Sequence, residues 1–303
     1  MKEQKEISFF EYFGVAKKYI GNITLVFEFL KNQEGIGYNI FKKGKLIRYL
    51  SSHYLVRDRK KLKNNKTWLC YKKDFNKKIV VGYQGLWFFC RETVWSPSVD
   101  AVFMIDAINK YKSLSINNFS SILDYGCGSG VVGISLAKKS KKVKELSLVD
   151  VNDSALFCSL INCIGNNLKV NFNIANHLNK KRYDLGLVTP YYFPIEKRDY
   201  LDSRQAMQAI VKAGKDSAIM INDLSKICSE VFFVYSSITE KVFREELSVK
   251  YKDVCYMDVP FSLGDNVSSN SLVGAAAENN LLIFKKDSQF KFWHRIYMAK
   301  IIS

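Results

Sequence analysis

The chain contains few of the residues that form metal sites and disulfide frameworks. Among 303 residues there are three His, four Pro and seven Cys, and no two cysteines form a CxxC pair. The sequence therefore offers no zinc-ligand pattern. Most of the cysteines lie in apolar runs and their number is odd, so we expect buried free thiols in a reducing, cytoplasmic compartment.

Long apolar runs are also absent. The stretch Ile20–Leu30 is apolar but short, and Glu28 interrupts it. The first residues, MKEQKEIS, carry both signs of charge and do not resemble a signal peptide. The sequence therefore predicts a soluble protein without a membrane span.

Acidic residues are scarce in one region. Between Phe41 and Val80 there are 14 Lys or Arg but only two acids, within a chain of net charge +17. Aromatic residues are interleaved with these charges: Tyr49, Tyr54, Trp68, Tyr71 and Phe75. Basic groups that neutralise phosphates, beside aromatic rings on which bases stack, favour an RNA, DNA or ribosome-associated protein partner. A lysine-rich composition without a binding role is the alternative.

A glycine-dense turn separates two apolar runs in the middle of the chain. The first run ends in Asp124, and Gly126-Cys127-Gly128-Ser129-Gly130 follows. The helix-like segment Val131–Lys139 then leads to the apolar run Leu146–Val149, which ends in Asp150. This order of strand, glycine turn, helix, strand and acid predicts a βαβ unit that binds a ligand at its first turn.

Two classes of ligand fit such a unit. Gly128–Gly133 matches the dinucleotide fingerprint GxGxxG, with Asp150 at the distance expected of a ribose-binding acid. Asp124 favours the other class, because a carboxylate two positions before the first glycine would repel a pyrophosphate. S-adenosylmethionine has no phosphate, and its ammonium and sulfonium groups suit an acid there. A flavodoxin-like or reductase turn with an incidental Asp124 is the alternative.

The rest of the chain alternates between strand and helix patterns. Predicted strands are Val170–Ile174, Tyr183–Val188, Val231–Ser236, Val254–Val259 and Leu281–Phe284, and predicted helices are Ala101–Tyr111, Ser154–Ile164, Arg204–Val211 and Glu240–Val249. This alternation predicts a parallel sheet covered on both faces. The last two strands leave no room for a helix between them, which predicts one antiparallel strand at the sheet edge. We expect the tail Gln289–Ser303 to pack back as a helix or to touch substrate.

The glycine turn carries a family resemblance. Asp124-Tyr125-Gly126-Cys127-Gly128-Ser129-Gly130 resembles motif I of class I S-adenosylmethionine-dependent methyltransferases. The resemblance implies an α/β fold with a Rossmann-like, seven-stranded, mostly parallel sheet and helices on both faces. It also implies a set of residues that bind the methyl donor: Asp124, Gly126 and Gly128 at the methionine end, Asp150 at the ribose and Asn176 at the adenine, with Cys127, Gly130 and Val151 also in the cofactor site. Asn162 also matches a position that this group usually fills with Asn.

Two further segments resemble the small-domain group, which includes protein-glutamine N5 and adenine N6 methyltransferases. Pro97 and Asp100 match a segment that covers the methionine end of the donor in that group, although Ala101 replaces its hydroxyl residue. Thr189-Pro190-Tyr191-Tyr192 occupies the place of the Asn/Asp-Pro-Pro-Tyr motif, which binds a planar amino group. Thr189 replaces the amide or acid and Tyr191 the second proline, and a hydroxyl accepts fewer hydrogen bonds than a carboxamide.

Together these patterns predict a basic N-terminal α+β domain at 1–92, a methyltransferase domain at 93–288 and an aromatic, basic tail at 289–303. The expected function is methyl transfer from S-adenosylmethionine, leaving S-adenosylhomocysteine, to nitrogen in a nucleic acid or a translation-associated protein. Two alternatives stay open: a methyltransferase of a small metabolite, and an inactive module that binds the donor together with RNA or a protein partner.

Overall fold

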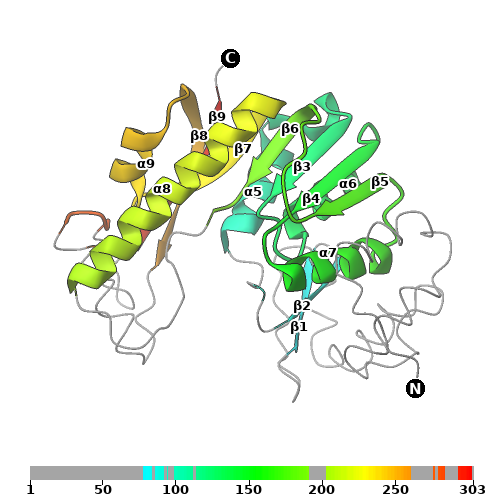
Figure 1. The fold of residues 1–303 in the computed structure, drawn as a ribbon, viewed down its shortest axis with the longest axis horizontal. Helices are drawn as coiled ribbons and strands as arrows, with labels where there is room; N and C mark the ends of the chain where they lie inside the picture. Colours follow the sequence, from blue (N-terminus) through cyan, green and yellow to red (C-terminus); the bar gives the residue numbers. More distant parts are fainter. Residues whose placement is uncertain are drawn as a thin grey trace. The chain divides into compact units, whose positions relative to one another are not determined.

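The computed structural model describes residues 78–83, 86–91, 94, 99–111, 114–190, 203–260, 276, 279–283 and 293–301, and these are coloured in Figure 1. Residues 1–77 of the predicted N-terminal domain, and with them nearly all of the basic stretch 41–80, lie outside these residues. The chain forms two compact units, Met1–Ser98 with Ile116–Asn179, and Val99–Ser115 with Lys180–Ser303.

The first unit contains the predicted βαβ segment. In chain order its elements are β1 (Lys78–Tyr83), β2 (Leu86–Arg91), η3 (Ile116–Asn118), β3 (Ser121–Tyr125), α6 (Val131–Lys139), β4 (Glu145–Val149), α7 (Asp153–Gly165) and β5 (Asn171–Ala175). β3, β4 and β5 pair in parallel, whereas β1 and β2 form a separate antiparallel hairpin. The middle of β3 and most of α6 are buried, as expected of a sheet covered by helices.

The second unit contains α5 (Val99–Lys110), β6 (Tyr183–Val188), α8 (Ser203–Ile227), β7 (Cys228–Ser236), α9 (Glu240–Glu246), β8 (Tyr251–Pro260) and β9 (Trp293–Ile301). β6 and β7 are parallel, and β9 is antiparallel to both β7 and β8. The seven strands β3–β9 form one sheet in the order β5-β4-β3-β6-β7-β9-β8. This mixed, Rossmann-like sheet confirms the predicted fold class.

The prediction of a helix in the tail is wrong. Trp293–Ile301 forms strand β9, in which buried and half-buried residues alternate. The ring of Tyr297 stacks on that of Tyr235 in β7, with centroids 4.7 Å apart. The antiparallel strand is therefore β9, which lies between β7 and β8 and not at the edge. The predicted strand at 281–284 contributes, within the described residues, only an isolated bridge from Ile283 to Trp293.

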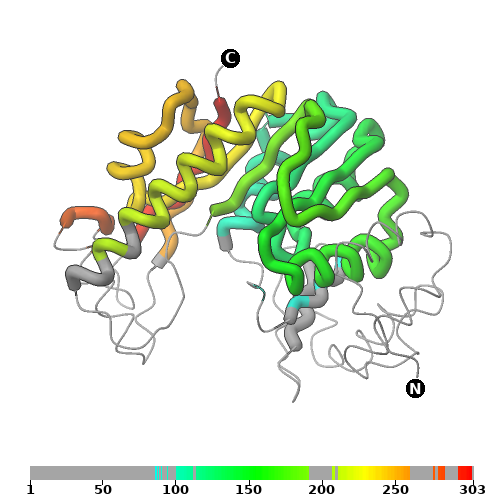
Figure 2. The backbone as a smooth tube through the Cα atoms, viewed as in Figure 1, coloured from blue at the N-terminus to red at the C-terminus, as the bar shows by residue number. Residues whose placement is uncertain are grey.

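Helix α8 (Ser203–Ile227) is much longer than the predicted helix 204–211, and it is the long green-to-yellow helix in Figure 1 and in Figure 2. It continues through Gly214, although glycine costs about 1 kcal/mol inside a helix. A Cβ atom at Gly214 would lie 3.1 Å from Cβ of Val242 in α9. Glycine therefore allows α8 and α9 to pack closely.

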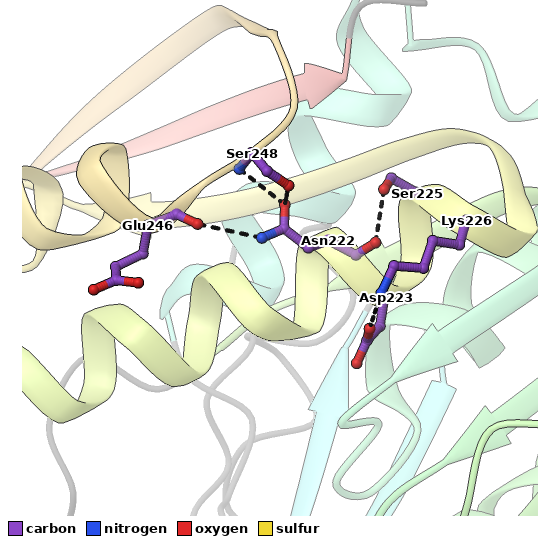
Figure 3. Close-up of polar contacts among 6 residues, drawn as sticks. All are labelled: Asn222, Asp223, Ser225, Lys226, Glu246 and Ser248. Carbon is purple, nitrogen blue, oxygen red and sulfur yellow. Dashed lines mark hydrogen bonds and ion pairs between the residues drawn. The ribbon is translucent and has the colours of Figure 1, made fainter.

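A hydrogen-bonded group fixes the end of α9 to α8 (Figure 3). The side-chain NH2 of Asn222 in α8 donates to the backbone carbonyl of Glu246 at 3.3 Å. Its side-chain oxygen accepts from the backbone amide and the hydroxyl of Ser248, at 3.1 and 2.9 Å. Asp223 and Lys226, one helical turn apart, form a surface ion pair beside it. Asn222 thus supplies partners to the backbone where α9 ends.

Candidate functional site

The glycine turn after β3 has the backbone geometry of a ligand-binding loop. Gly126, Gly128 and Gly130 have φ values of 72°, 54° and 77°, in the left-handed region that favours glycine. The amides of Gly126 and Cys127 both donate to the carbonyl of Val149, at 2.8 and 3.0 Å. The turn is therefore fixed to the end of β4, directly before Asp150.

Asp124 is buried beneath this turn. It is 2% exposed, and its Oδ2 accepts the Gly133 amide at the start of α6 at 2.8 Å. A Cβ atom at Gly133 would lie 2.9 Å from that oxygen, so a glycine is needed there. Burial raises the pKa of Asp124 to about 7; the Gly133 hydrogen bond partly offsets this, and the nearby Asp150 adds to it. Gly133 was missed as a functional position, although it is the third glycine of GxGxxG.

Asp150 lies at the carboxyl end of β4 and binds two backbone amides. Its Oδ2 accepts from Gly128 and its Oδ1 from Asn152, at 2.8 and 2.9 Å. The Val151 amide also interacts with this carboxylate. A carboxylate has about four acceptor positions, so Asp150 keeps capacity for a hydroxyl group. Val151, which follows, is 87% exposed, which is unusual for a large apolar side chain. Together they can bind a ligand with hydroxyls and an apolar face.

Asn176 directly follows β5, and its neighbour Ala175 accepts the Asp150 amide at 3.2 Å. The Asn176 side chain is exposed, and its Oδ1 lies 2.8 Å from Nδ1 of His177. The structure thus brings the ends of β4 and β5 together, with Asn176 beside Asp150.

The turn is further supported by α7. Asn162, which is 1% exposed, donates from its amide to the carbonyl of Ser129 at 2.8 Å. Ser159, which is fully buried, donates to the carbonyl of Gly128 at 2.9 Å. We did not predict Ser159 from the sequence. The sequence feature that could have identified it is a polar residue on the apolar face of α7, three positions before Asn162.

The electrostatics of this turn fit the methyl donor better than a dinucleotide. Burial raises the pKa of both Asp124 and Asp150, so a ligand that brings a positive charge or hydroxyl groups would stabilise each carboxylate. A pyrophosphate at the turn would lie close to the Asp124 carboxyl group. S-adenosylmethionine offers an ammonium group, a sulfonium group and ribose hydroxyls, and the residues present fit it.

The other predicted residues fall in the second unit or outside the described residues. Asp100 is half-buried in the first turn of α5. Thr189 is half-buried and Pro190 is buried, directly after β6. Pro97, Tyr191 and Tyr192 are outside the part of the chain that the structure describes.

The described residues contain neither a cluster of metal ligands nor a membrane-spanning helix. No group of three or more His, Cys, Asp or Glu side chains there could hold a metal ion. No helix in the same part of the chain is both long and apolar enough to cross a membrane.

Comparison with known proteins gives one family and several relatives. Residues 100–250 match the family model of the methyltransferase small domain. The ribosomal RNA small subunit methyltransferase C of Buchnera aphidicola subsp. Cinara cedri is 42% identical over 101 residues, 31% of this chain and 29% of that protein. The release factor glutamine methyltransferase of Clostridium acetobutylicum is 33% identical over 94 residues, 31% of this chain and 32% of that protein. The matched part of the chain thus spans about a third of the length of these relatives.

Among solved structures, the tRNA (uracil-54, C5)-methyltransferase of Pyrococcus abyssi in complex with S-adenosyl-L-homocysteine is similar with a TM-score of 0.42. It is 16% identical, and the match covers 75% of this chain and 44% of that one.

Proposed function

Because residues 100–250 belong to the methyltransferase small domain family, we propose that this protein transfers a methyl group from S-adenosylmethionine to a nitrogen atom of its substrate. The family match agrees with the resemblance found in the sequence. The observation that carries the proposal is the glycine turn, with Asp124 buried beneath it and Asp150 bound to its Gly128 amide.

In this proposal the first unit binds the methyl donor. Asp150 accepts hydrogen bonds from the ribose hydroxyls, Val151 contacts the adenine and Asn176 binds its amino group. Asp124 and the turn from Gly126 to Gly130 hold the cationic methionine end. When bound, S-adenosylmethionine supplies a methyl group activated by its positive sulfur.

The remaining contribution of the chain is to position the acceptor. In this proposal Thr189 and the carbonyl of Pro190 accept hydrogen bonds from a planar amino group, Tyr192 stacks on that group and Tyr191 completes the motif. These contacts direct the nitrogen lone pair toward the methyl group, and such positioning supplies much of the rate enhancement of a displacement reaction. No covalent nucleophile is required.

The experiment that tests the donor site is calorimetric titration of the protein with S-adenosylmethionine, beside an Asp150→Ala variant. We expect micromolar binding, weakened about 10- to 100-fold in the variant, because hydrogen bonds to a charged group contribute about 1.5–3 kcal/mol. Absence of binding to the unmodified protein would overturn the proposal.

We propose a nucleic acid or a translation-associated protein as the substrate, with residues 1–92 as an accessory domain that binds it. The basic stretch 41–80 supports this choice. The described residues add a second basic segment, since exposed lysines follow one another from the end of α6 into β4: Lys138, Lys139, Lys141, Lys142 and Lys144. The named relatives act on ribosomal RNA and on a release factor.

A second candidate, an inactive module that binds the methyl donor, is favoured by one observation: Thr189 stands where the family motif has an amide or acid. If Thr189 only weakens the acceptor site, Thr189→Asn should raise methylation of a planar amine, because a carboxamide directs its hydrogen bonds better than a hydroxyl. The readout is methyl transfer to RNA and to release-factor substrates. Unchanged or lower activity would count against a weakened acceptor site, whereas no methyl transfer by either protein would argue for the inactive module.

A further inference from the structure

Ser159 holds the glycine turn from below. Its hydroxyl donates to the carbonyl of Gly128 at 2.9 Å, while Asn162 donates to the next carbonyl, that of Ser129, at 2.8 Å. The two side chains are three positions apart and therefore lie on one face of α7. Both are buried, so water does not replace them readily.

The direction of the hydrogen bonds at Ser159 follows from its single proton. That proton is donated to the carbonyl of Gly128, so Ser159 can only accept from the thiol of Cys127, whose Sγ lies 3.5 Å from Oγ. Burial raises the pKa of Cys127, which keeps the thiol protonated. The thiol can donate its proton either to Ser159 or to the carbonyl of Gly128, which is 3.8 Å from Sγ, so both side chains surround that carbonyl.

Gly128 is held on both sides. Its amide donates to Oδ2 of Asp150 at 2.8 Å, and its carbonyl accepts from Ser159. Its φ of 54° is in the left-handed region. Glycine adopts positive and negative φ values about equally readily, so it does not favour this conformation by itself. The orientation of Asp150 is therefore linked through one residue to the hydroxyl of Ser159.

We propose that Ser159 is a positioning residue for methyl-donor binding: by fixing Gly128, it holds Asp150 so that the free acceptor capacity of the carboxylate faces the ribose. This inference rests on the proposed function. It gives α7 the role of fixing the orientation of Asp150, which the glycine turn does not fix by itself.

The chain offers a matched control for the test. Ser135 in α6 is also fully buried in the same unit, and its hydroxyl has no hydrogen-bond partner among the residues that the structure describes. Ser159→Ala and Ser135→Ala each delete one buried hydroxyl, but only the first deletes a bond to the turn. Ser159→Cys keeps a group of similar shape that donates weakly.

Two measurements on the full chain test the proposal: titration with S-adenosylmethionine, and hydrogen exchange of the Gly128 amide without ligand. Ser159→Ala should raise Kd about tenfold, the size expected for a lost hydrogen bond in a buried network, and should speed exchange at Gly128. Ser159→Cys should fall between Ser159→Ala and the unmodified protein, and Ser135→Ala should match the unmodified protein in both measurements.

The outcomes separate this inference from the proposed function. If the unmodified protein binds S-adenosylmethionine and Ser159→Ala binds it equally well, the inference is overturned and the function stands. A lower thermal stability with unchanged Kd and unchanged Gly128 exchange also overturns it, because that is a purely structural effect. If the unmodified protein does not bind, the proposed function fails, and the exchange rate still decides whether Ser159 holds Gly128. Should Ser159→Ala not fold, Ser159→Cys decides the matter on both measurements.

Discussion

At the scale of single residues, the charged form of Asp124 lowers the stability of the free protein but favours binding of the methyl donor. Its pKa is raised from 3.8 to about 7 in the folded protein, chiefly by burial. Between these values the folded state keeps a proton that the unfolded state has lost, so this group makes the protein less stable as pH rises through the window. A cationic methyl donor favours the carboxylate, so donor affinity should increase as pH rises through about 7.

The variant Asp124→Asn separates these effects, because the amide oxygen can still accept the Gly133 hydrogen bond. At pH 8 we expect the free variant to unfold about 2 °C or more above the unmodified protein, since a buried charge is removed. We expect its affinity for S-adenosylmethionine to fall about tenfold and to lose the pH dependence near 7. Thermal scans and titrations at pH 6 and 8 measure both. A variant that keeps the same pH dependence would point to Asp150 instead.

At the scale of elements, the second unit depends on contacts between segments far apart in the sequence. Asn222→Ala removes three hydrogen bonds that α8 makes to the end of α9, drawn in Figure 3. We expect a loss of about 1 kcal/mol in the free energy of unfolding, because these bonds are exposed to water. The matched control is Asp223→Ala, which removes only the surface ion pair with Lys226 and should cost less than about 0.5 kcal/mol. Equal losses in urea unfolding would contradict the role of Asn222.

At the scale of the whole molecule, the net charge of +17 separates the candidate substrates. If RNA is the substrate, its affinity should fall about tenfold or more between 50 and 200 mM salt, as expected for three or more neutralised phosphates. Fluorescence anisotropy with a labelled RNA measures this, and titration with S-adenosylmethionine in the same buffers is the control, with little change expected. RNA binding that is weak and insensitive to salt would favour a small metabolite.

The sequence by itself determined the βαβ unit and the identity of the acids in it. The run from Asp124 to Asp150 is local: glycines that tolerate positive φ, a helix that starts at the turn and apolar strands on either side are all encoded within some thirty residues. The observed β3, α6 and β4 agree with that pattern.

Only the tertiary structure decided features that depend on distant partners. Trp293–Ile301 is a strand because β7 and β8 lie on either side of it and the Tyr235 ring stacks on Tyr297. The raised pKa of Asp124 follows from its burial, and the role of Ser159 follows from the packing of α7 against the turn. Burial and hydrogen-bond partners come from chain segments that local spacing does not bring together, so they could be recognised only once the chain was folded.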